Sequence, residues 1–197
     1  KNNIKIIPGK YDICLISEPV VDQNLEEEFE RTTDYFKAPG IVAEYVHRLC
    51  SKNNFKLIFS GKKKLDDPNL EEEENYYKKY LKSYNFKIYQ PLKNGYGTHL
   101  NIMQSKLIIG TSSTALREAF SFKKKVLSCN ITNHPGINYP SGGLSVLNSS
   151  SYNDFEERVL KILSLDTEEY EKKLNKKMEF TMLPTTNTAN LIRNKIN

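Results

Sequence analysis

The sequence predicts an α/β domain with a doubly wound parallel sheet, a Rossmann-like arrangement. Short apolar runs rich in strand-forming residues alternate with amphipathic segments of helical period, and short polar connections separate them. This alternation is typical of parallel strands whose two faces are covered by helices. The chain has 197 residues, 38% of them apolar, which is enough for one domain with a substantial core.

Six segments have the character of strands. The first, YDICLIS at 11–17, is bounded by Pro8-Gly9 and by Pro19, and the others end at similar polar, Gly or Pro positions. The other five predicted strands are 55–61, 86–91, 106–111, 124–130 and, as the shortest run, 144–148.

Helical patterns lie between and after these strands. The segment 20–37 contains four glutamates and is expected to be loop with some helix and a solvated acidic face. Asn153 or Asp154 is the expected N-cap of the helix with the strongest apolar face. The predicted helices are 39–53, 69–84, 152–165 and a mostly charged one from about Thr167.

Composition excludes several classes of protein. No apolar run approaches the ~20 residues that span a bilayer. The start KNNIKIIPGK has no signal-peptide core, so we expect a soluble, cytoplasmic domain cut from a longer protein. The cysteines Cys14, Cys50 and Cys129 have unrelated spacings and are expected to be buried free thiols rather than metal ligands.

The chain is basic, with a net charge of +5 and the sequence KKK at both 62–64 and 123–125. Nucleic-acid binding is one interpretation and solvated lysine faces are the other. The second is favoured because no helix-turn-helix, zinc-finger or RNA-recognition signature is present. We therefore expect no nucleic-acid partner, although the lysines would suit an anionic membrane surface nearby.

A sheet of this type binds ligands outside the carboxyl ends of its strands, where the strand order reverses. That rule directs attention to the segments that follow the predicted strands. These segments are 17–19, 60–62, 90–99, 110–114 and 130–143.

A row of hydroxyls follows the fourth predicted strand. Gly110 permits a tight turn and the close approach of a ligand, and a helix begins near Ala115. The amides of a helix N-terminus suit a phosphate, to which hydroxyls donate further hydrogen bonds. One hydroxyl suffices to cap a helix, so four in a row favour phosphate binding over capping alone. The four are Thr111, Ser112, Ser113 and Thr114.

Charged residues near the strand ends are further candidates. Glu118 lies one helical turn after Thr114, where it could accept both hydroxyls of a ribose or serve as an ordinary first-turn glutamate. Lys62, after Ser60 and Gly61, could meet phosphates or belong to a solvated lysine run. Arg117 is expected on the surface.

Glu18, just past the first strand, is expected to face a cleft between domains. His99, in a glycine-rich loop ahead of a short helix, could donate to a diphosphate or a leaving group, or lie on the surface. His47, in the middle of an amphipathic helix, is expected to be structural.

The run SKLIIGTSSTALREAFSFKKKVLSCN, residues 105–130, resembles the donor-binding, carboxyl-terminal half of GT-B glycosyltransferases that build bacterial surface polysaccharides. The resemblance is specific over about 100–150. It implies that 1–197 is a single nucleotide-sugar-binding domain with C-terminal helices over about 153–197. It also implies an acceptor-binding N-terminal domain outside this chain, and an inactive domain in its absence.

The resemblance further implies a donor site for capsule or lipopolysaccharide synthesis. Ser112, Ser113 and Thr114 would hold the donor's diphosphate, and Glu118 the ribose. The base would contact the exit of the third strand at 89–91. The whole set of implied donor-site residues is Ser60, Gly61, Lys62, Tyr89, Gln90, Gly110, Thr111, Ser112, Ser113, Thr114 and Glu118.

The motif leaves the reaction open. A nucleotide-sugar 2-epimerase, a polyol-phosphate transferase and a non-catalytic binding module share it with glycosyltransferases. The catalytic residues are expected in the missing domain, with His99 as the candidate in this chain, and the acceptor is expected to be a carbohydrate or glycolipid. His134-Pro135 resembles a sialyltransferase motif, but its order relative to the serine row is reversed.

Other cofactor chemistry has no support in the sequence. It contains neither a P-loop lysine motif nor GxGxxG. Asp66-Asp67 is followed by Pro68 in a turn, so it is not a metal-binding DxD motif. We therefore expect no cofactor besides the nucleotide-sugar substrate and no metal, and the helix dipole and hydroxyls would stabilise the leaving diphosphate.

Overall fold

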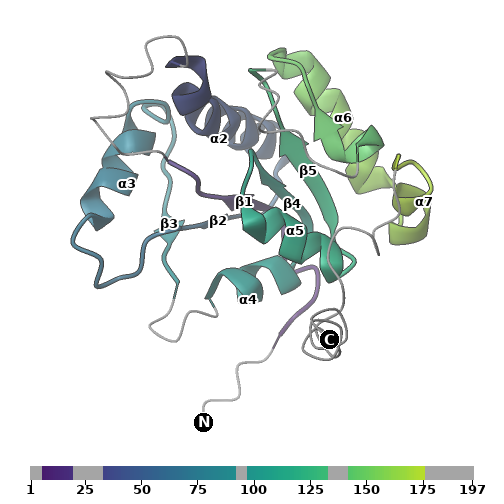
Figure 1. Ribbon diagram of the computed structural model, residues 1–197, viewed down its shortest axis with the longest axis horizontal. Helices are drawn as coiled ribbons and strands as arrows, with labels where there is room; N and C mark the ends of the chain where they lie inside the picture. The colour runs from purple at the N-terminus through teal and green to yellow at the C-terminus, as the bar shows by residue number, and fades with distance from the viewer. Residues whose placement is uncertain (1–5, 20–32, 92–96, 133–141, 176–197) are drawn as a thin grey trace, which may run out of the picture.

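Six parallel strands form one sheet, in the order β3-β2-β1-β4-β5-β6 (Figure 1). The computed structural model describes residues 6–19, 33–91, 97–132 and 142–175. The order reverses between β1 and β4, which confirms the predicted doubly wound, Rossmann-like class. The strands are β1 (Tyr11–Ile16), β2 (Leu57–Ser60), β3 (Ile88–Tyr89), β4 (Ser105–Gly110), β5 (Lys125–Cys129) and β6 (Val146–Leu147).

The core lies on both faces of the central strands. Cys14 of β1 pairs with Ile58 of β2 on one side and with Ile108 of β4 on the other. All three are at most 1% exposed. A parallel strand covered on both faces reads as a continuous apolar run rather than an alternating one, which is why these segments were recognisable in the sequence.

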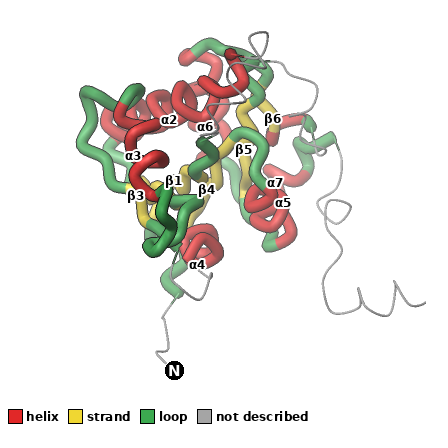
Figure 2. Tube along the Cα trace, turned by 60° about the vertical axis from the view of Figure 1, so that its left-hand side comes forward, coloured by secondary structure: helices red, strands yellow, loops and turns green. Residues whose placement is uncertain are grey.

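Helices cover both faces of the sheet (Figures 1 and 2). α2 (Thr33–Asn53) and α6 (Tyr152–Ser164) pack together on one face, with α3 (Leu70–Lys78) beside α2. α4 (Gly97–Met103) and α5 (Thr114–Ser121) cover the other face. The 3₁₀ helix η3 (Gly143–Ser145) precedes β6, and α7 (Thr167–Glu171) follows α6.

The first helix begins earlier than predicted, at Thr33 rather than Pro39. A proline inside a helix removes a backbone donor and usually ends the helix. Here the hydroxyl of Tyr76, from α3, lies beside the helix backbone, where it donates to the Phe36 carbonyl and accepts from the Gly40 amide. Tertiary packing therefore keeps α2 continuous through the proline.

Several boundaries differ from the prediction because side chains outside the periodic pattern set them. The N-cap of α6 is Ser151, whose hydroxyl accepts from the Asp154 amide, and neither Asn153 nor Asp154. β3 spans two residues of the six expected, and α3 ends at Lys78 rather than at residue 84. His99 lies inside α4 and not in the loop before it.

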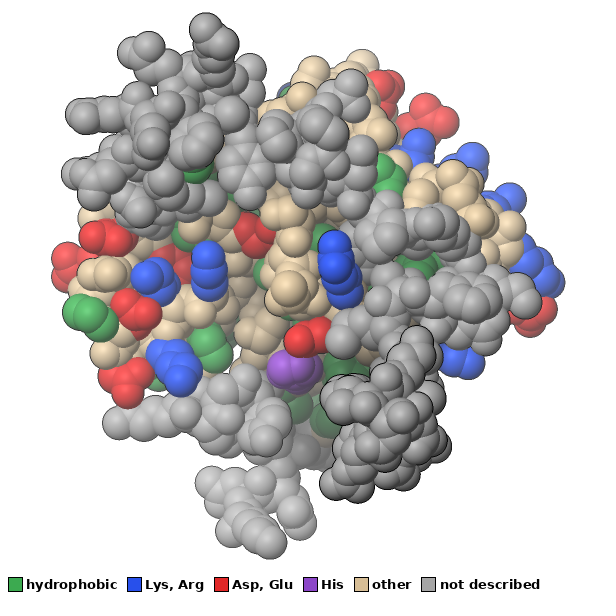
Figure 3. Space-filling view, in the orientation of Figure 1, with side chains coloured by type: hydrophobic (Ala, Val, Ile, Leu, Met, Phe, Trp, Pro, Cys, Tyr) green, Lys and Arg blue, Asp and Glu red, His purple; other side chains and the backbone are tan. Residues whose placement is uncertain are grey.

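Lysines of the second KKK run are engaged in the fold. The Lys124 ammonium donates to the carbonyls of Met103 and Ser105, and the Lys125 ammonium donates to those of Ile162 and Leu165. Burial lowers the pKa of both lysines. Acidic and basic side chains are mixed on the left part of the face shown in Figure 3. The hydrogen bonds and burial of Lys124 and Lys125 favour a structural role for this run over a nucleic-acid surface.

The three cysteines are buried and free, as predicted. Burial raises the pKa of Cys14 and of Cys50 to about 12, so neither is a reactive thiolate at neutral pH. Across the described part of the chain, no helix is both long and apolar enough to span a bilayer.

Removing side-chain volume at the centre of the sheet should cost more stability than removing the same atoms from the exposed segment before β1. Ile108→Ala should lower the free energy of unfolding by about 2–5 kcal/mol, since it leaves a cavity in β4. Ile7→Ala, at a residue that is 50% exposed, should change it by less than about 0.5 kcal/mol. Urea unfolding of both variants measures the difference, and equal losses would contradict this account of the core.

His47 should make stability depend on pH. Burial lowers its pKa, and its Nδ1 lies 2.8 Å from the Ala43 carbonyl oxygen. The unfolded chain takes up a proton near pH 6.5, so the stability that neutral His47 contributes is present above that pH and is lost as the pH falls below it.

Between pH 7.5 and 5.5, this group should account for a loss of at most about 1.4 kcal/mol. His47→Phe should remove that part of the loss. Urea unfolding at the two pH values measures it, and the same loss in both proteins would show that His47 does not contribute.

Candidate functional site

A cavity of about 500 Å³ lies at the carboxyl ends of the central strands, at the reversal of strand order. Doubly wound sheets bind ligands at this place. Four connections contribute to its wall, and the lining residues are Ile16, Ser17, Glu18, Gly61, Lys62, Lys64, Pro91, Thr98, His99, Ser112, Ser113, Thr114, Ala115 and Glu118. A larger cavity, of about 620 Å³, lies between β6 and α6 at the sheet margin, away from the reversal point.

The carboxylate of Glu18 occupies the turn between β4 and α5. Its Oε1 accepts from the Thr111 amide at 2.8 Å. Its Oε2 accepts from the Ser112 amide at 2.7 Å, from the Thr111 hydroxyl at 2.8 Å and from the Ser112 hydroxyl at 3.3 Å. Two amides and two hydroxyls thus surround a negative charge that belongs to the chain itself. We call these four donors the Glu18 cradle.

Gly110 makes this approach possible. A Cβ at position 110 would lie 2.4 Å from Glu18 Oε1, closer than two such atoms can come. The sequence predicted close approach of a ligand at this glycine, and the group that approaches is a side chain. Burial raises the pKa of Glu18, and the hydrogen bonds from Ser112 and Thr111 oppose part of that rise. Glu18 nevertheless lines the cavity, and its position at a cleft between domains stays a prediction.

The other two hydroxyls of the row lie differently. The Ser113 hydroxyl accepts from the Ala115 amide at 3.2 Å and is the N-cap of α5, while Thr114 is the first residue of that helix. Both residues line the cavity. The N-terminus of α5 therefore faces the cavity, whereas Thr111 is buried behind Glu18.

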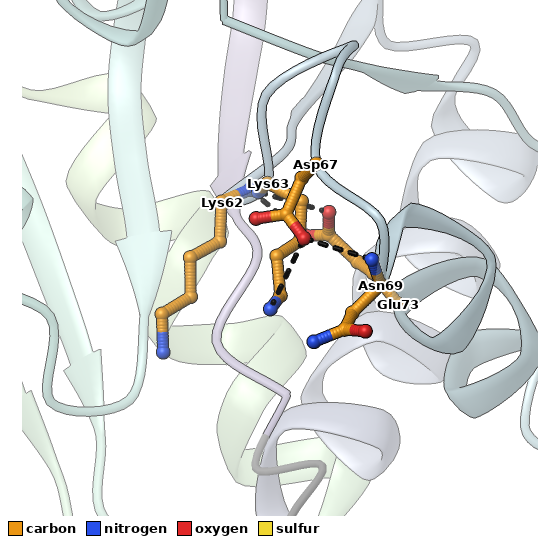
Figure 4. Close-up of polar contacts among 5 residues, drawn as sticks. All are labelled: Lys62, Lys63, Asp67, Asn69 and Glu73. Carbon is orange, nitrogen blue, oxygen red and sulfur yellow. Dashed lines mark hydrogen bonds and ion pairs between the residues drawn. The ribbon is translucent and has the colours of Figure 1, made fainter.

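A second carboxylate, Glu73 of α3, shapes the turn after β2 (Figure 4). It is fully buried and accepts from the amides of Lys62 at 2.8 Å and Lys63 at 3.1 Å, and from the Ser17 hydroxyl. Sequence reasoning missed it because Glu73 stands in a run of four glutamates, 71–74, and nothing in the spacing separates it from its exposed neighbours.

The two lysines held by Glu73 point in different directions (Figure 4). Lys63 turns back toward Asp67, with the ammonium 3.7 Å from that carboxylate. The Lys62 side chain extends away from this cluster, and Lys62 and Lys64 line the cavity while Lys63 does not. Within the described ranges, the structure gives the ammonium groups of Lys62 and Lys64 no ion pair.

Glu118 and His99 form a pair on the opposite wall. His99 Nε2, from α4, lies 3.0 Å from Glu118 Oε2, from α5, and both side chains are partly exposed. The sequence predicts separate roles for them, Glu118 at the ribose and His99 at a diphosphate or leaving group. The structure instead brings them together as one polar unit between two helices.

The remaining predicted residues lie behind or outside the cavity wall. The Ser60 hydroxyl accepts from Asn101 and is buried. Tyr89 is 44% exposed, with the Lys87 ammonium over its ring. The amide group of Gln90 packs against Gly61, where a Cβ would lie 2.1 Å from Oε1.

Gln90 is unusual because both polar atoms of its side chain are buried without a hydrogen-bond partner in the described structure. Such a group costs about 1–3 kcal/mol, which is consistent with a role other than stability. His134 and Glu26 to Glu30 lie outside the described residues.

Of the eleven residues proposed from the sequence, six line the cavity. They are Gly61, Lys62, Ser112, Ser113, Thr114 and Glu118. Among the described residues, no group of three or more His, Cys, Asp or Glu side chains is placed to hold a metal ion. The arrangement offers two ammonium groups and a helix N-terminus for an anion, and a His–Glu pair for hydroxyls or protons.

Comparison with known proteins identifies the chain's family. Residues 19–139, more than half of the chain, match a family model described as "putative O-antigen biosynthesis protein". No curated protein matches. Among solved structures, the crystal structure of TarM is similar, with 16% sequence identity and a TM-score of 0.47. That alignment covers 100% of this chain and 37% of TarM, so the chain spans little more than a third of that protein's length.

Gly110 and Glu18 should be energetically coupled. Gly110→Ala should lower the free energy of unfolding by about 1–3 kcal/mol, because the new methyl group pushes the carboxylate out of its cradle. In a Glu18→Ala background the same substitution should cost much less, giving a coupling of at least about 0.5 kcal/mol. Urea unfolding of the four proteins measures this cycle. An equal cost in both backgrounds would mean that the close approach has no energetic consequence.

Proposed function

Because the chain belongs to the O-antigen biosynthesis family, we propose that it is the donor-binding domain of a nucleotide-sugar-dependent glycosyltransferase for surface carbohydrate. The observation that carries this proposal is the cavity at the reversal of strand order, which combines lysines, a helix N-terminus and a His–Glu pair. The donor-binding motif of GT-B enzymes resembles the sequence around this cavity, and the doubly wound sheet is the fold that such a domain needs.

The phosphate of the donor would lie between Lys62, Lys64 and the start of α5. Lysine ammonium groups contribute fixed positive charge to a phosphate. The amides of a helix N-terminus add partial positive charge and hydrogen-bond donors. During transfer these groups would stabilise the negative charge that develops on the leaving phosphate, without a metal ion.

The His99–Glu118 pair would bind the ribose or deliver a proton to the leaving group. Its 3.0 Å contact holds the imidazole in one orientation at the cavity wall. The base would contact the exit of β3 at 89–91, where Pro91 lines the cavity. In this proposal another domain of the protein would bind the acceptor and supply the catalytic base. The protein would act at the cytoplasmic face of the membrane.

A thermal-shift panel tests nucleotide binding at this site. It would include UDP, GDP, CMP, CDP and a non-nucleotide diphosphate. A nucleotide at about 100 times its dissociation constant should add ~2.7 kcal/mol to stability and raise the melting temperature by several degrees. Lys62→Ala should weaken the shift, since it removes a cation from the cavity.

Lys63→Ala is the matched control. Lys63 stands in the same turn and has the same charge, but it faces Asp67. The proposal fails if no nucleotide stabilises the protein, or if both lysine variants weaken the shift equally. Product analysis with the active enzyme then separates sugar transfer from 2-epimerisation and polyol-phosphate transfer, and an absence of turnover would indicate a binding module.

A further inference from the structure

The Glu18 carboxylate occupies a turn whose donors are suited to an anion. The Glu18 cradle consists of two backbone amides and two hydroxyls, and Gly110 beside it permits close approach. These are the elements that proteins use to bind a phosphate beside a helix N-terminus. In this chain a carboxylate from the end of β1 satisfies all four donors at 2.7–3.3 Å.

The charges around the cavity also leave little net positive charge for an anionic ligand. Among the described lining residues, the positive charges of Lys62 and Lys64 are balanced by the negative charges of Glu18 and Glu118, and His99 is paired with Glu118. A donor linked through one phosphate brings a single negative charge, and a donor linked through a diphosphate brings two. The second phosphate would have no cradle and would lie near the Glu18 carboxylate.

We propose that Glu18 is a specificity-determining residue that limits the number of donor phosphate groups bound in the cavity to one. This inference rests on the proposed function. The substrate class would then be a sugar activated as a nucleoside monophosphate. The phosphate would be bound by Lys62, Lys64 and the start of α5, with Glu18 retained in its cradle. The inference concerns which donor the cavity accepts, and it does not require Glu18 to take part in the reaction.

Removing Glu18 should open the cradle to a second phosphate. We would measure dissociation constants for UMP, UDP, CMP and CDP by calorimetry, using the intact protein and its Glu18→Ala variant. In the unsubstituted protein, the diphosphate should bind no more tightly than the monophosphate of the same base. In Glu18→Ala, the diphosphate should bind about tenfold more tightly than before, as expected for charge-assisted bonds to an opened anion site, and the monophosphate should change less than about threefold.

Two further variants keep the result interpretable. Glu118→Ala removes a carboxylate from the same cavity without opening a cradle, so it should favour the diphosphate much less than Glu18→Ala does. Glu18→Gln retains the side-chain shape and an acceptor oxygen while removing the charge. This variant replaces Glu18→Ala in the measurement if Glu18→Ala does not fold. It should also favour the diphosphate, by a smaller factor.

The inference would be overturned if the ratio of the two affinities were the same with and without Glu18 in folded protein. It would also be overturned if the unsubstituted protein bound diphosphates tenfold more tightly than monophosphates. Inorganic pyrophosphate separates this inference from the proposed function. If no nucleotide binds, a gain of pyrophosphate binding in Glu18→Ala would uphold the role of Glu18 while the proposed function fails, and no gain would reject both.

Discussion

The carboxylate of Glu18 joins the two strands between which the sheet reverses its order. It leaves the end of β1 and accepts four hydrogen bonds from the turn that follows β4. The edges of a cavity at a reversal point are loops, and loops are the least constrained parts of such a fold. A carboxylate without these donors would be costly to bury, so the Glu18 cradle and the turn that forms it depend on each other.

Glu73 acts in the same way on the next loop. It is buried below the turn after β2 and fixes the amides of Lys62 and Lys63, which leaves the Lys62 side chain to enter the cavity. Two carboxylates of the chain thus hold the backbone on either side of the site, and the groups left for a ligand are two lysines, the N-terminus of α5 and the His99–Glu118 pair. A preorganised site of this kind would bind a phosphate without first ordering its loops, as the proposed function requires.

The sequence predicted most of the architecture because strand and helix periodicity reflect burial directly. The central run IIGTSST identified β4, the following turn and the helix N-terminus together, and six of the eleven proposed residues line one cavity. Periodicity could not reveal partners that are distant in the sequence. Glu18 and Thr111 are 93 positions apart, and Glu73 resembles its exposed neighbours until the helix is placed against the sheet. For the same reason, the sequence predicts a start of α2 at Pro39 that is six residues too late. The hydroxyl that supports the helix backbone on both sides of Pro39 comes from Tyr76, which is distant in the sequence.

The most direct test of this account is a crystal structure of the protein with CMP bound. We expect the phosphate to contact Lys62, Lys64 and the start of α5, while the Glu18 carboxylate stays on the amides of Thr111 and Ser112. A phosphate bound by those two amides, with Glu18 displaced from its cradle, would contradict the account and make Glu18 a side chain that ligands replace.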